Sequence, residues 1–178
     1  MRKIILLCVA VFLFISALSW AQNPIDIKGW NKTSWGMTED NLMELFPGQI
    51  TRIAKQEIDH GKIYCNLKLT NYKIGDTEFD VLFGMSAIDN KLKHVRLVRN
   101  SALPSHFSQF EQLLIDKYGQ PQSKEVLQGI ANSYDKIDSW SLPSTKIELT
   151  FSYAVGSMGI LNIIYSDQIL RKEKLDKL

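Results

Sequence analysis

Residues 63–70 have the sequence IYCNLKLT, in which apolar and polar side chains alternate without interruption. Alternation with a period of two predicts a β-strand that has one buried face and one solvated face. The same pattern returns in residues 146–153, which read KIELTFSY. These two stretches predict a sheet with one apolar face, which other elements must cover.

Turn signals on either side of these stretches separate further short apolar segments. Gly75-Asp76 and Asp89-Asn90 fit tight turns after the first strand, and residues 156–159 fit a turn after the second. Short connections between consecutive strands predict antiparallel meanders, with three strands in each half of the chain. The additional strands are predicted at residues 78–85, 92–98, 138–142 and 160–165, and polar loops at 49–62 and 122–138.

One helix is predicted before each meander. Thr38 is a good N-cap for a first helix, which ends at Pro47-Gly48. Pro104 begins a second helix, whose apolar residues recur at helical spacing and which ends at Gly119. We therefore expect an α+β fold, an antiparallel sheet with two helices on one face.

The same order of elements occurs in both halves of the chain. Aligning Phe46-Pro47-Gly48 with Tyr118-Gly119-Gln120 gives a tandem helix-plus-three-strand repeat, with half-repeats at 35–100 and 101–165. Few residues are identical between the halves, so two unrelated halves remain the alternative. Either way, residues 35–165 are predicted to form a single α+β domain, preceded by an irregular lead-in at 22–34 and followed by a charged tail at 166–178.

This order, with Trp35-Gly36-Met37-Thr38 before the first helix and residues 117–121 (KYGQP) closing the second, resembles small exported bacterial proteins. The helix-plus-meander pattern is similar to the superfold shared by the outer-membrane assembly lipoprotein BamE and the β-lactamase inhibitor protein. The chain lacks the lipidation cysteine of the first and the cysteine pairs of the second. The resemblance implies a binding or assembly role and transfers no functional residue.

Residues 1–21 have the layout of a secretory signal peptide. Arg2 and Lys3 precede an uncharged run from 4 to 15, and the small residues Ser19 and Ala21 fit a cleavage site after Ala21. The alternative is a membrane anchor, but a spanning helix needs about 20 apolar residues and this run is shorter. We expect an exported protein, periplasmic or extracellular in a bacterium, with no stable membrane insertion after cleavage.

Charge and cysteine content restrict the partners. Two of the 21 basic residues lie in the signal segment, which leaves 19 against 19 acidic residues. A chain with no net charge and no cluster of like charges does not predict a surface that binds nucleic acid. Cys65 is the one cysteine after the signal, so no internal disulfide can form. We expect a protein partner and no cofactor; the oligomeric state is left open.

No motif predicts catalysis or a metal site. The chain has no nucleophile elbow, phosphate loop or zinc-binding His-Glu-x-x-His motif. Cys65 lies in the apolar register of its strand, which favours a structural role. The predicted function is therefore a non-enzymatic exported binding or assembly module. The alternative is an exported hydrolase whose site is assembled from distant segments, drawing on Glu57, Asp59, His60, Cys65 and His94.

Three aromatic residues are the candidates for partner contact. They are Trp30, Tyr64 and Tyr72, since aromatic side chains bury much area at little entropic cost. We expect them on the sheet face that the helices leave uncovered. Trp35 is predicted to pack beneath the first helix, whereas Trp30 could be either buried or exposed.

Overall fold

Eight strands form one antiparallel sheet in the order β1-β2-β3-β4-β8-β7-β6-β5. The structure is a computed structural model and describes residues 25–58, 60–129 and 132–168. The signal segment, part of the lead-in and most of the tail lie outside these residues. The elements are α2 (Glu39–Leu45), β1 (Ile50–Ile58), β2 (Ile63–Ile74), β3 (Thr77–Ser86), β4 (Leu92–Ala102), α3 (Pro104–Tyr118), β5 (Ser123–Gln128), β6 (Ser133–Ser141), β7 (Thr145–Ala154) and β8 (Gly159–Asp167).

The α+β class with an antiparallel sheet is confirmed, but the number of strands differs from the prediction. Four strands follow each helix, because β1 and β5 occupy stretches predicted as polar loops. Both lie at the edges of the sheet, where a strand pairs on one side only. Most β1 residues and nearly all of β5 are exposed, so neither carries the alternation that identifies an inner strand. β6 also begins before the predicted residue 138.

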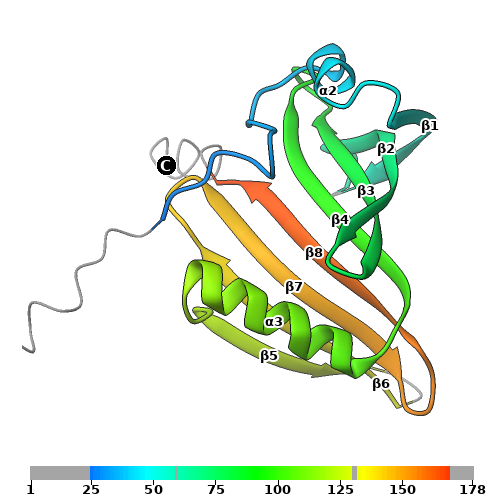
Figure 1. The fold of residues 1–178 in the computed structure, drawn as a ribbon, viewed down its shortest axis with the longest axis vertical. Helices are drawn as coiled ribbons and strands as arrows, with labels where there is room; N and C mark the ends of the chain where they lie inside the picture. The colour runs from blue at the N-terminus through cyan, green and yellow to red at the C-terminus, as the bar shows by residue number, and fades with distance from the viewer. Residues whose placement is uncertain (1–24, 59, 130–131, 169–178) are drawn as a thin grey trace, which may run out of the picture.

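The two halves meet where β4 pairs with β8. Val95 lies opposite Tyr165, and Leu97 lies opposite Ile163. Figure 1 shows these strands side by side, with α3 lying across the C-terminal half and α2 at the far end of the N-terminal half. Since β8 also pairs with β7, the last strand of the described residues lies in the middle of the sheet.

The helix termini follow the predicted capping. The Thr38 hydroxyl accepts a hydrogen bond from the Asn41 N–H, and the Asn41 side chain accepts one from the Thr38 N–H. These two bonds satisfy donors that the first turn of α2 would otherwise leave free. At the end of α3, Gly119 has φ 82°, a left-handed conformation that glycine adopts without steric cost.

A continuous apolar core lies between α3 and the sheet. Phe110 contacts Phe79 of β3 edge-on, with ring centroids 5.1 Å apart, and Phe107 lies 6.3 Å from Phe151 of β7. Trp140 of β6 is fully buried and donates a hydrogen bond to the Gly119 carbonyl at 2.7 Å. These contacts join α3 to strands of both halves of the sheet.

The described part of the lead-in, residues 25–34, is fastened to the sheet near its start and directly after its end. Near its start, Asp26 accepts two hydrogen bonds from Ser144, from the backbone N–H and the hydroxyl, each at 2.8 Å. Directly after its end, the Trp35 indole donates to the Thr145 hydroxyl, and the Gly36 N–H donates to the Leu92 carbonyl. The lead-in therefore has a fixed position on the α3 side of the sheet.

Within the described residues, no helix has the length and apolarity needed to cross a membrane.

Candidate functional site

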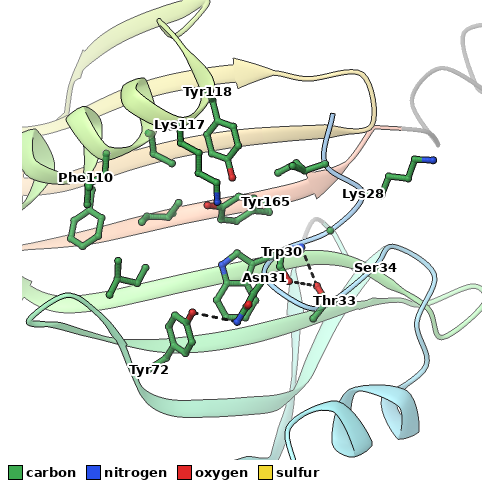
Figure 2. A pocket seen from close by; sticks show the side chains of 16 residues that line it. Lys28, Trp30, Asn31, Thr33, Ser34, Tyr72, Phe110, Lys117, Tyr118 and Tyr165 are labelled. Carbon is green, nitrogen blue, oxygen red and sulfur yellow. Dashed lines mark hydrogen bonds between the residues drawn. The ribbon is translucent and has the colours of Figure 1, made fainter. Parts of the chain in front are cut away.

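A pocket of about 550 Å³ opens between the lead-in, α3 and the sheet. We call it the Trp30 pocket, and Figure 2 shows it from close by. Its volume lies within the range of roughly 300–1,000 Å³ that is usual for small-molecule sites. The lining side chains come from four parts of the chain: the lead-in, the end of β2, the last three turns of α3, and β8.

The Trp30 side chain is held by aromatic neighbours on several elements. Its ring lies edge-on to Tyr72 at 5.0 Å and to Phe83 at 6.3 Å, and it stacks near Phe46 at 6.4 Å. Only 6% of Trp30 is exposed, so most of its surface serves packing. The part that remains accessible forms one wall of the pocket.

A tight turn in the lead-in fixes the direction of the Trp30 side chain. The Thr33 hydroxyl accepts from the Trp30 N–H and donates to the Trp30 carbonyl, at 3.0 and 2.7 Å. Asn31, in the left-handed region at φ 53°, donates through Nδ2 to the Tyr72 hydroxyl at 3.3 Å. Gly29 is required next to this turn, because a Cβ there would lie 2.1 Å from the Thr33 carbonyl oxygen.

The opposite wall is formed by α3. Phe110, Leu113 and Leu114 supply apolar surface, and Leu113 remains 45% exposed. Tyr118 meets Tyr165 of β8 at the end of the helix. Burial first, and then the charge and hydrogen bond of Tyr118, raise the pKa of Tyr165 well above its ordinary value. The Tyr165 hydroxyl therefore keeps its proton over the whole physiological range.

The structure brings together two of the three aromatic residues selected from the sequence. Trp30 and Tyr72 are in contact and both line the pocket. Tyr64 lies elsewhere: it is 7% exposed, and its hydroxyl donates to Asn90 and Glu39 at 3.0 and 3.3 Å. Trp35, predicted to be buried, is only half-buried, although it does pack against the core.

The pocket lies on the α3 side of the sheet, whereas the sequence prediction placed the contact residues on the uncovered face. On that face, polar side chains are bonded to one another. Lys68 pairs with Asp80 at 2.8 Å. Arg96 donates to Asn162 at 2.9 Å, which in turn donates to Thr150 at 3.0 Å. These polar groups satisfy one another and leave little hydrogen-bonding capacity for a ligand, so the pocket is the better candidate site.

Of the residues of the hydrolase alternative, Cys65 lies in a setting that disfavours nucleophilic chemistry. Cys65 is fully buried, and burial raises the pKa of its thiol to about 11, although nearby Arg96 acts to lower it. Because the thiolate is the nucleophile, this thiol is unreactive at neutral pH. His94 is bonded to Ser166 on β8, at 3.2 Å from Nδ1. Asp59 lies outside the described residues.

Among the residues that the structure describes, no three His, Cys, Asp or Glu side chains are grouped closely enough to hold a metal ion.

A second polar cluster lies beneath α3, away from the pocket. Asp138 of β6 is 4% exposed and faces Glu111 of α3. Burial first, and then the charge and hydrogen bond of Glu111, raise the pKa of Asp138 to about 6. Lys124 of β5 bonds to Glu111 and lies 3.9 Å from Asp138. Buried carboxylate pairs occur in active sites, but this pair opens into no described pocket and we read it as structural.

Comparison with known proteins gave no match to a family model, a curated protein or a solved structure.

Proposed function

We propose that the protein is an exported, non-enzymatic binding protein and that the Trp30 pocket is its binding site. The observation that carries the proposal is the pocket itself. Apolar and aromatic side chains from distant parts of the chain converge on a space large enough for a small ligand. The resemblance of the sequence to exported binding and assembly proteins supports the same role, and a protein partner could present the group that enters the pocket.

The lead-in and α3 favour binding over catalysis. Several turns of α3 supply apolar surface, and its ionisable contribution to the pocket is a lysine and a tyrosine. Acid–base catalysis in such a site would need a group that titrates near neutral pH and lies within reach of the substrate. The high pKa of Tyr165 makes that residue a hydrogen-bond donor instead of a base.

We also propose that both helices cover one face of the sheet and that the halves are repeats of one unit. Phe46, which follows α2, lies 5.9 Å from Phe83, and Phe110 of α3 lies 5.1 Å from Phe79. Phe79 and Phe83 are four residues apart on β3, so they point to the same face. The order of one helix and four strands, occurring twice, supports duplication.

A neutral fluorescent probe tests the binding site. N-phenyl-1-naphthylamine becomes bright in apolar pockets and carries no charge. We expect saturable binding with one site per chain. For a ligand of about 17 non-hydrogen atoms at about 0.3 kcal/mol per atom, the dissociation constant is roughly 0.2 mM.

Two substitutions on the exposed surface of α3 locate the site. Leu113→Glu places a charge on the pocket wall and should weaken binding of the probe at least tenfold. Gln109→Glu adds the same charge to an exposed position of α3 that does not line the pocket, and should leave binding unchanged. Equal binding by both variants and the wild type would place the probe elsewhere. Turnover of simple ester substrates by purified protein would contradict the non-enzymatic role.

The mass of the recovered chain tests whether the signal segment has been removed during export. Expression in a bacterium followed by cell fractionation should recover a periplasmic or secreted chain that begins at residue 22. Recovery of the intact chain in the membrane fraction would favour the anchor alternative.

A further inference from the structure

One corner of the Trp30 pocket gathers hydrogen-bond donors. Lys117, in the last turn of α3, extends toward the hydroxyl groups of Tyr118 and Tyr165 (Figure 2). Its Nζ lies 5.2 Å from the centroid of the Tyr118 ring. Within the described part of the chain, Lys117 forms no ion pair. Its positive charge is therefore available to a ligand.

The charged side chains that line the pocket are all basic. The lining includes two lysines, Lys28 and Lys117, and no aspartate or glutamate. Figure 2 shows that Lys28 points away from the other labelled side chains, whereas Lys117 points among them. The Tyr118 and Tyr165 hydroxyls are hydrogen-bonded to each other, so one of the two protons remains available to a ligand beside the Lys117 ammonium group. This hydroxyl and the ammonium group, with no acidic side chain in the lining, fit an anionic group on the ligand.

Apolar surface extends from this corner along α3. Leu114, Leu113 and Phe110 precede Lys117 by three, four and seven residues, so they lie on one side of the helix. Ile74 of β2 and Ile27 of the lead-in contribute to the same lining. Seven residues of helix span roughly 10 Å, the length of roughly eight extended methylene groups. The pocket thus offers a charged end and an apolar length of one hydrocarbon chain.

We propose that the Trp30 pocket binds a single-chain aliphatic carboxylate. The carboxylate lies against Lys117, Tyr118 and Tyr165, and the hydrocarbon chain lies along Leu113, Leu114 and Phe110. This assignment rests on the proposed function, because it names the ligand of the same site. It goes further in requiring a charged head group of one sign and a chain of limited length.

Displacement of the neutral probe by decanoate and by decanol, below their aggregation concentrations, tests the head group. Wild-type protein should bind decanoate about tenfold more tightly than decanol, the effect of one charge-assisted hydrogen bond at a partly solvated site. Lys117→Met keeps the aliphatic stem and removes the charge, so this variant should bind decanoate and decanol about equally. Lys62→Met makes the same change at an exposed position that does not line the pocket; it is the matched control and should retain the tenfold preference.

A series of carboxylates tests the chain. Each added methylene that becomes buried should tighten binding about fourfold, which corresponds to about 0.8 kcal/mol. The gain should stop near ten carbons, where the chain reaches Phe110. An undiminished gain through sixteen carbons would overturn the assigned length.

The remaining outcomes separate the two proposals. If decanoate and decanol bind equally to the wild type, the carboxylate assignment is wrong while the binding site stands. If neither ligand nor the neutral probe binds, the proposed function fails with it. Tighter binding of decyl phosphate than of decanoate would reject the carboxylate in favour of a phosphate head group. An equal loss of preference in Lys62→Met and Lys117→Met would contradict the placement of the head group.

Discussion

The carboxylate pair beneath α3 predicts a specific dependence of stability on pH. The folded protein raises the pKa of Asp138 from 3.8 to about 6, because the side chain is buried and faces Glu111. A carboxyl whose pKa is raised on folding is favoured in its protonated form. Its stabilising contribution is therefore complete below pH 3.8 and is lost as the pH rises through about 6.

The magnitude follows from the change in pKa. At 1.36 kcal/mol for each pKa unit, the full change would correspond to about 3 kcal/mol. The charge of Lys124 is already included in the pKa of about 6, but this side chain is half-exposed 3.9 Å from Asp138, so solvent screens part of the effect. We expect about 1–2 kcal/mol to remain.

Asp138→Asn removes the ionisable group while its amide can still donate a hydrogen bond to Glu111. We expect this variant to be about 1–2 kcal/mol more stable than the wild type at pH 8 and close to it at pH 4. Urea unfolding followed by circular dichroism, repeated across this range, measures the difference. Asp135→Asn changes the same residue type on the same strand but on the opposite face, and should show no such trend. A difference for Asp138→Asn that is constant with pH, or destabilisation at pH 8, would refute the reasoning.

Three further substitutions or treatments test the packing around the site. Trp30→Ala should lower the free energy of unfolding by about 3–5 kcal/mol and abolish probe binding, since it removes a nearly buried ring; Trp30→Phe should cost less in the same urea titration. Gly29→Ala should lower the free energy of unfolding by about 1–3 kcal/mol, because the added Cβ would clash with the Thr33 carbonyl. Gly48→Ala should be less destabilising, because a Cβ there meets no atom and only the positive φ of 70° is unfavourable. Cys65 should resist alkylation by iodoacetamide at pH 8 in native protein and react in 8 M urea, as mass spectrometry can show; rapid labelling of the folded protein would contradict its burial.

The inner strands could be predicted from the sequence because their burial follows a period of two. In β7, Ile147, Leu149 and Phe151 are buried, whereas the residues between them are only partly buried. The alternation of apolar and polar residues in the sequence therefore matches the alternation of burial in the strand. β1 and β5 are held by backbone hydrogen bonds to a single neighbour and bury few side chains. A sequence pattern of apolar residues cannot reveal such a strand, which is why both were predicted as loops.

The candidate site could be predicted only in part. Trp30 and Tyr72 were identified singly, as large aromatic residues in polar surroundings. Their contact with each other, and the approach of Lys117, depend on the pairing of β4 with β8 and on the anchoring of the lead-in at Ser144. These pairings join residues far apart in the chain, and no local pattern encodes them. Tyr64 has the same residue type as Tyr72, but it belongs to the buried core and its hydroxyl is bonded to Asn90 and Glu39.

The central position of β8 has a consequence for how the chain reaches its native state. β4 ends at Ala102, whereas the strand with which it pairs begins only at Gly159, after α3 and three other strands. Until that strand is available, the first four strands present an unpaired edge, and the remaining three have nothing to join them to it. The two halves therefore cannot close into one sheet before residues 159–167 are available to pair with both β4 and β7.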